Sequence, residues 1–329
     1  MTLKNLLFFV ISLTFINICF VDSVFSNSTI VITSENNINE LQRLATAIIQ
    51  GQKNEVVKLL KNGFDRNLLL KKVLVKDYSG RKIQGTPLQL ALGAEDLNNA
   101  KQPEIAEVVK RALLEMPGGY TEFTAQVREQ FPAGWEEKEN IRVVKDKRAV
   151  TKVFNCILHA SPAGDEYKDL ERICGVPLQE FRNYLEPKKT IKTGKHFNIQ
   201  ILLDGILLLG NNYDALGGWN SVKGNVYYRK VIGYIERFVP ANYAQALSEE
   251  LIVNGEMKRR FELLDNYGHQ VSFYPLDLDA TYRLGYDFGV EGGYTHQYLP
   301  PLSFGSSFIN LIKSKQVELK HWVEDARAY

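Results

Sequence analysis

The chain has 329 residues, of which 40 are basic and 38 acidic, so the formal net charge is +2. Hydrophobic residues make up 45% and charged residues 24%, values that exclude a collagen, a disordered tail and a polytopic membrane protein. The balanced charge argues against a general nucleic-acid binder, and 3 cysteines are too few for a disulfide-framed mini-protein or a multi-cysteine zinc site.

The N-terminal segment, residues 1–26, has the pattern of a secretory signal peptide. Lys4 supplies a short basic region, and an apolar stretch runs from Leu6 to Val21 before the small residue Ser26. We expect cleavage after about Ser26, which predicts a secreted or periplasmic protein. The alternative is an uncleaved helix that anchors the chain to a membrane, although a full span takes about 20 apolar residues.

After a linker at residues 27–37, residues 38–116 twice show a short helix, a tight turn and a second antiparallel helix. In the second copy, the word TPLQLA begins at Thr86, which can cap a helix, and Pro87 fits the first helical turn because no N–H partner is lost there. Gly51 and Gly63 are placed to end helices, since the left-handed conformation is favourable mainly for glycine.

These words resemble the ankyrin repeat, in which TPLHLA opens the first helix and an EVVKLL-type second helix comes after it. The resemblance implies stacked helix pairs that bind proteins through loops and a concave face and rarely carry chemistry. Gln89 stands where the family has histidine, so the unit is degenerate. Because about three repeats are needed to bury a solenoid core, we expect this unit to pack on later parts of the chain. Apolar residues in the 64–84 segment predict a short β-hairpin between the pairs.

Residues 117–329 are predicted to form an α-helical domain. The spacing of apolar residues predicts helices at 120–131, 146–160, 178–185, 196–211, 225–239, 241–253, 308–315 and 317–326. From Gly268 onward, aromatic residues, glycine and proline predict a long loop region. The predicted fold class is therefore mostly α, with degenerate ankyrin-like helix pairs followed by an α-helical domain that carries a long aromatic-rich loop region.

Cleavage of the signal peptide would leave Cys156 and Cys174 as the remaining cysteines. In an oxidising compartment they could form a disulfide worth about 3 kcal/mol. We expect instead two buried free thiols on separate helices, because a free cysteine packs as a small hydrophobic residue.

Several words in the second half resemble a block found in ankyrin-repeat proteins of intracellular bacterial pathogens. They are FPAGWEE at 131–137, IKTGKHFN at 191–198, GGW at 217–219, RKVIGYIERFVPANYAQAL at 229–247 and FYPLDLDATYRLGYDF at 273–288. The resemblance implies a host-interaction factor and no particular activity. The predicted signal peptide is a difference from the effectors of type IV secretion, because those proteins typically lack one.

Complete catalytic motifs such as HExxH, GxSxG and GxGxxG do not occur. Asp277 and Asp279, one residue apart, are weak candidates for binding a divalent cation, and capping a turn or pairing with Arg283 is the alternative. An enzyme with a site near His196 and these three residues is a second hypothesis. We otherwise predict no catalytic residue, no cofactor and no metal.

The sequence favours an exported protein that binds another protein. Tyr78, Trp135 and Trp219 are candidate anchors because aromatic side chains dominate binding hot spots, and Gln89 is a fourth candidate. Ordinary core packing is the alternative for each. The partner is expected to be a protein and not a nucleic acid, and a membrane contact is expected only if the N-terminal helix is uncleaved.

Overall fold

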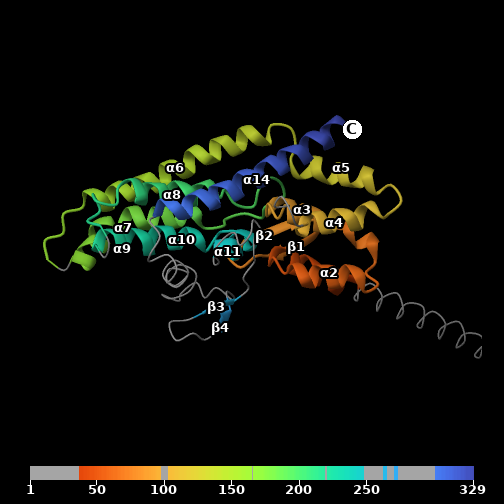
Figure 1. Cartoon of the computed structure of the whole chain (residues 1–329), viewed down its shortest axis with the longest axis horizontal. Coiled ribbons are helices and arrows are strands. Elements are labelled where there is room, and N and C mark those ends of the chain that lie inside the picture. The colour runs from red at the N-terminus through yellow and green to blue at the C-terminus, as the bar shows by residue number, and fades with distance from the viewer. Residues whose placement is uncertain are drawn as a thin grey trace, which may run out of the picture. The chain divides into compact units, whose positions relative to one another are not determined.

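A computed structural model describes residues 37–97, 103–164, 166–218, 221–247, 262–264, 270–272 and 301–329 (Figure 1). These residues are mostly α-helical, which confirms the predicted mostly α class, and they include two short β-hairpins. The contacts separate Met1–Arg43 from a compact unit, Leu44–Tyr329. The predicted signal peptide lies outside the described residues, and the predicted domain boundary at 116/117 stays a prediction.

Two helical segments lie on either side of Gly51, where the sequence predicts helices. Residues 37–49 are helical, and α2 (Lys53–Lys61) comes after the turn. Gly51 and Gly63 have φ angles of +65° and +79°, so both glycines take the left-handed conformation at helix ends. The stacking of helix pairs as in an ankyrin array stays a prediction.

A β-hairpin comes next, as the apolar residues predict. β1 (Val73–Lys76) pairs antiparallel with β2 (Lys82–Gly85), and Val75 stands opposite Ile83. Leu68 and Leu69 are not part of this hairpin, since they lie in the 3₁₀ helix η1 (Arg66–Leu70) and are buried there. The hairpin leads directly into the next helix.

Thr86 caps α3 (Pro87–Gly93), as predicted, through a capping box with Gln89. The Thr86 hydroxyl oxygen accepts a hydrogen bond from the Gln89 backbone N–H (3.3 Å), and the Gln89 side-chain oxygen accepts one from the Thr86 backbone N–H (3.0 Å). The next helix, α4 (Ile105–Leu114), packs against α3. The start of this second pair is therefore set by local sequence.

The remaining elements are mainly helices. They are α5 (Gly119–Gln130), α6 (Trp135–His159), α7 (Glu166–Leu185), α8 (Gln200–Asn211), α9 (Val222–Tyr227), the π-helical turn η2 (Tyr228–Ile232), α10 (Gly233–Glu236), α11 (Ala241–Leu247), β3 (Glu262–Leu264), β4 (Gln270–Ser272) and α14 (Pro301–Ala328). β3 and β4 form the second hairpin. Of the predicted aromatic-rich loop region, most residues lie outside the described ranges.

Several predicted helix boundaries are wrong, including those of α6, α7 and α14. α6 begins at Trp135 rather than 146, because its first three turns bury no apolar side chain and so show no helical pattern. α7 begins at Glu166 and continues through Pro177, where the sequence suggested a boundary. α14 is one helix instead of two.

The helices α6 to α10 enclose the main apolar core, in which the rings of Phe154 and Tyr227 meet edge to face at 5.0 Å. α14 lies against α8 and reaches α5 (Figure 1). At that end, Trp322 packs on Phe123, and the Lys110 ammonium of α4 lies 4.1 Å from the centre of the Trp322 ring. The last helix thus contacts α4, so the second pair packs on later residues, as expected.

Cys156 in α6 and Cys174 in α7 form a disulfide, with their Cα atoms 5.9 Å apart. The prediction of separate helices is confirmed, and the prediction of free thiols is wrong. α6 and α7 are packed against each other, and this places the two side chains face to face, which sequence separation alone does not reveal.

Candidate functional site

Residues 191–198 form a short irregular segment between α7 and α8, and we call it the clasp. Hydrogen bonds connect this segment to the hairpin and helices of the first half. It enters beside β2, where the Ile191 N–H donates to the Lys82 carbonyl (2.9 Å) and the Ile191 carbonyl accepts from the Gln84 N–H (2.8 Å). Ile191 thus extends the first hairpin on the β2 side. The clasp has the sequence IKTGKHFN, so the structural role of this motif is to hold the hairpin and the helices around it together.

The next part of the clasp is held by hydrogen bonds to its own backbone groups. Gly194 and Gln130 exchange two of them, because the Gly194 N–H donates to the Gln130 carbonyl (2.6 Å) and the Gln130 side-chain amide donates to the Gly194 carbonyl (2.7 Å). The His196 N–H donates to the Gly93 carbonyl (2.7 Å), and the Arg81 guanidinium donates to the His196 carbonyl (3.2 Å). The clasp therefore forms hydrogen bonds with the hairpin, with α3 and with α5.

Glu95, just after α3, is the charged centre of this region. Its carboxylate lies 2.7 Å from the Lys195 ammonium, and both side chains are less than a tenth exposed. Its carbonyl accepts hydrogen bonds from the Asn242 amide (3.0 Å) and from the Lys315 ammonium (3.1 Å), which also donates to the Leu97 carbonyl (3.2 Å). Glu95 has a φ of +54°, a strained angle for a residue with a side chain. Three distant parts of the chain hold it there.

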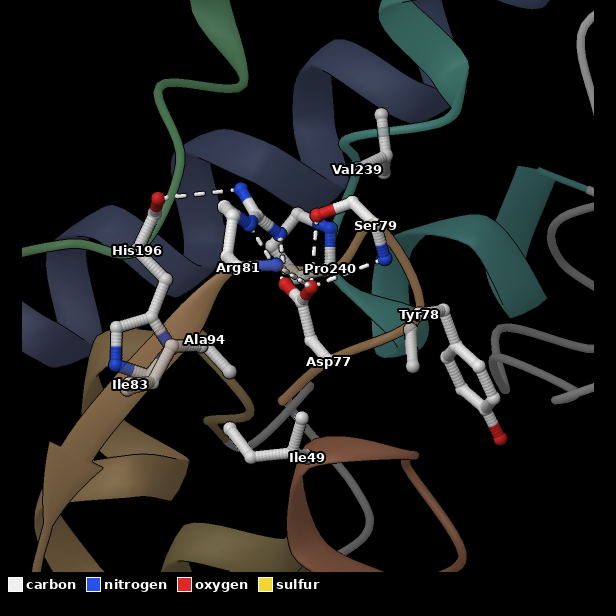
Figure 2. Close-up of a pocket in the computed structure, with 11 residues that line it drawn as sticks. Ile49, Asp77, Tyr78, Ser79, Arg81, Ile83, Ala94, His196, Val239 and Pro240 are labelled. Atoms are coloured by element: carbon white, nitrogen blue, oxygen red, sulfur yellow. Dashed lines mark hydrogen bonds and ion pairs between the residues drawn. The ribbon is translucent and has the colours of Figure 1, made fainter. Parts of the chain in front are cut away.

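The turn of the first hairpin contains a second buried ion pair. The Arg81 guanidinium lies 2.5 Å from an Asp77 carboxylate oxygen, and the other Asp77 oxygen accepts from the Ser79 hydroxyl (2.7 Å). Figure 2 shows the three side chains converging beside His196. Buried charges persist in proteins when they are paired and hydrogen-bonded, as here.

A small pocket lies against this turn. It is lined by the hairpin turn and by Ala94, His196 and residues Val239 to Ala241, and its free volume is about 10 Å³ (Figure 2). That is room for about one water molecule. In Figure 2 the Tyr78 ring points away from the Asp77–Arg81 pair. The pocket as it stands is therefore too small for a substrate.

His196 is a poor candidate for a general base. Burial, together with the nearby positive charges of Arg81 and Arg142, lowers the pKa of His196 to about 3. A general base works best when its pKa lies near the operating pH, whereas this imidazole is held neutral and weakly basic. Asp277, Asp279 and Arg283 lie outside the described residues, so the enzyme hypothesis built on them stays a prediction.

The clasp ends on a polar cluster beneath α6. The Asp146 carboxylate accepts hydrogen bonds from the Tyr184 hydroxyl (2.6 Å) and the Asn198 amide (2.7 Å). Arg142 donates to the Lys195 carbonyl (3.2 Å). Burial raises the pKa of Asp146 and that of Glu139, which lies 3.2 Å from Arg142. The first half of α6 therefore rests on polar contacts with the clasp rather than on the apolar core.

The candidate docking residues are placed differently from one another. Tyr78 is partly buried at the pocket, and burial raises its pKa. Gln89 is only 1% exposed, and its amide donates to the Gln126 carbonyl (3.2 Å) and the Glu129 carboxylate (2.9 Å), so its contacts are internal. Trp135 is partly exposed and stacks obliquely on Phe131 at 4.9 Å.

Trp219 and the cation candidates Asp277 and Asp279 lie outside the described residues. In the part of the chain that the structure describes, no three His, Cys, Asp or Glu side chains gather as a metal site, and no helix is long and apolar enough to cross a membrane. Sequence reasoning missed Glu95 and Lys315, since neither belongs to a chemical motif. The signal that could have found Glu95 is an acidic residue directly after the apolar helix at 87–93.

Comparison with protein-family models, characterised proteins and solved structures finds no match to this chain. The resemblance to ankyrin-repeat proteins therefore rests on the words TPLQLA and EVVKLL and on those of the second half.

Proposed function

We propose that this chain is an exported protein that binds a protein partner through the face of its ankyrin-like unit that carries the first hairpin. The resemblance to ankyrin-repeat proteins of intracellular bacterial pathogens favours a host protein as that partner. The helices on either side of Gly51, the hairpin that comes after them, and α3 and α4 support the proposal, because the resemblance implies that ankyrin units present loops from such helices to other proteins.

The observation that carries the proposal is the exposure of Leu74. Side chains alternate between the two faces of a strand, so Val75 and Ile83 point inward and are buried, whereas Leu74 points outward and is 50% exposed. Gln84 stands opposite Leu74, and Lys76 and Lys82 stand opposite each other on the same outer face. A partner that covers the exposed Leu74 side chain would remove apolar surface from water, and this would favour binding.

The disulfide supports the exported location. Disulfides form and persist in oxidising compartments and are rare where thiols are kept reduced. The link between Cys156 and Cys174 therefore agrees with the predicted signal peptide, although the two features lie in different parts of the chain.

Affinity capture tests the function. The mature chain, Leu74→Ser and the control Val176→Ser would be immobilised and exposed to extracts of host cells. Val176 is 70% exposed in α7, so the control removes a comparable apolar surface elsewhere. We expect wild type and control to retain the same proteins and Leu74→Ser to retain at least tenfold less. Equal recovery with Leu74→Ser would remove the hairpin face from the proposal.

A further inference from the structure

β1 is the outer strand of the first hairpin. The Asp77 N–H donates to the Arg81 carbonyl, and from this pair the hydrogen-bonded pairs of an antiparallel ladder recur every second residue. The backbone groups of Val75 and Val73 therefore point toward β2, and those of Leu74 and Lys76 point away from it. The same counting on β2 directs Lys82 and Gln84 outward, and these are the residues that bond to Ile191.

The two edges of this hairpin differ. The β2 edge is taken by the clasp, whereas among the described ranges no segment pairs with the outward backbone groups of Leu74 and Lys76. Both side chains are exposed. An unpaired strand edge is a template on which another extended segment can add by main-chain hydrogen bonds.

The charge around this edge is positive. Lys71, Lys76 and Lys82 are exposed, and no carboxylate of the described residues forms an ion pair with them, whereas Lys72 pairs with Glu129. Lysines on an edge strand oppose pairing with a second copy of the same strand, because like charges would meet. The same lysines attract an acidic segment.

We propose that β1 binds an extended acidic segment of the partner protein, which adds as a further strand along Leu74 and Lys76. Acidic side chains of the segment face the lysines, and an apolar side chain at an alternate position covers Leu74. This proposal rests on the proposed function and adds to it the binding edge and the chemistry of the partner.

Amide hydrogen exchange in the full mature chain tests it. The probe is a synthetic peptide of alternating valine and glutamate. One control peptide replaces glutamate by lysine, and another carries N-methyl groups along one edge, which removes that edge's donors and keeps the side chains. We expect the Leu74 and Lys76 amides to exchange rapidly in the free protein and at least tenfold more slowly with the glutamate peptide, and neither control to protect them.

Two variants separate the contribution of the backbone N–H groups from that of the lysine charge. Leu74→Pro removes one outward N–H without removing a bond to β2, and it should abolish protection. Lys76→Glu should exchange the preference between the glutamate and lysine peptides. Slow exchange of both amides in the free protein, or equal protection by the N-methylated peptide, would overturn the proposal. If Leu74→Pro still captures the partner and Leu74→Ser does not, the proposed function stands and the edge pairing is wrong.

Discussion

The imidazole of His196 occupies the space that a side chain on Gly93 would need. A Cβ atom built on Gly93 would lie 2.1 Å from the His196 Nε2 atom, and the His196 N–H donates to the Gly93 carbonyl beside it. Gly93 is therefore required by the close approach of the clasp to α3. It is not among the glycines with a positive φ.

Gly93→Ala should destabilise the protein by about 3 kcal/mol, because a fully buried ring must move. Urea unfolding of the mature chain measures this. Gly175→Ala in α7 is the control, since a Cβ there meets no atom within 4 Å, and helix propensity predicts a change of at most about 1 kcal/mol in the stabilising direction. Similar losses in both variants would contradict the packing of His196 on α3.

His196 should make the protein less stable in acid. Its folded pKa is about 3, below an unfolded value of about 6.5, so between these values the unfolded chain binds a proton that the folded chain does not. Stability therefore falls as the pH falls through this window, and the contribution at pH 5 is about 2 kcal/mol. Glu139 and Asp146 have the opposite effect on stability. Burial raises their pKa, so their contribution to stability grows as the pH falls.

Two measurements isolate this effect. The NMR signal of the His196 ring should not titrate between pH 7 and pH 4. The stability lost between pH 7 and pH 5 should be smaller in His196→Phe than in wild type. A ring that titrates near pH 6 would show that His196 is not buried as described.

Lys195→Met should cost about 3 to 5 kcal/mol, because it leaves the Glu95 carboxylate buried without its counter-charge. The double variant Lys195→Met with Glu95→Gln should recover part of this loss. Lys152→Met is the control, since the Lys152–Glu180 pair is exposed and should contribute less than about 1 kcal/mol. Chemical unfolding of the four proteins would contradict the account if both lysine variants lost the same stability.

Cys156→Ser should lower the unfolding free energy by about 3 kcal/mol, since the link closes a loop of 18 positions. A reductant should destabilise the wild type by a similar amount and leave the variant unchanged. The measurement is unfolding with and without reductant, combined with a thiol count. Two free thiols in the purified mature protein would show that the link does not form.

Local signals in the sequence predict much of the helix-pair unit. Thr86 caps its helix and Gly51 ends one because these effects involve residues within a few positions of each other. The clasp could not be predicted in this way. Lys195 and Glu95 are 100 positions apart, and nothing near Lys195 in the sequence indicates burial.

The start of α8 shows the same limit. Helical spacing places it at His196, but the structure begins α8 at Gln200, because the residues before it are held by Gly93, Arg81 and Asp146. Tertiary hydrogen bonds thus outweigh helical periodicity at the candidate site. For the same reason the sequence did not single out Glu95.

Photo-crosslinking tests the central claim most directly. A photoreactive amino acid would replace Leu74 on the first hairpin in one protein and Val176 on α7 in another, and each mature chain would be irradiated with host-cell extract. A docking face on the hairpin predicts a covalent adduct with a discrete protein from position 74 and none from position 176. Adducts from position 176 alone, or from neither position, would contradict a docking face on the hairpin.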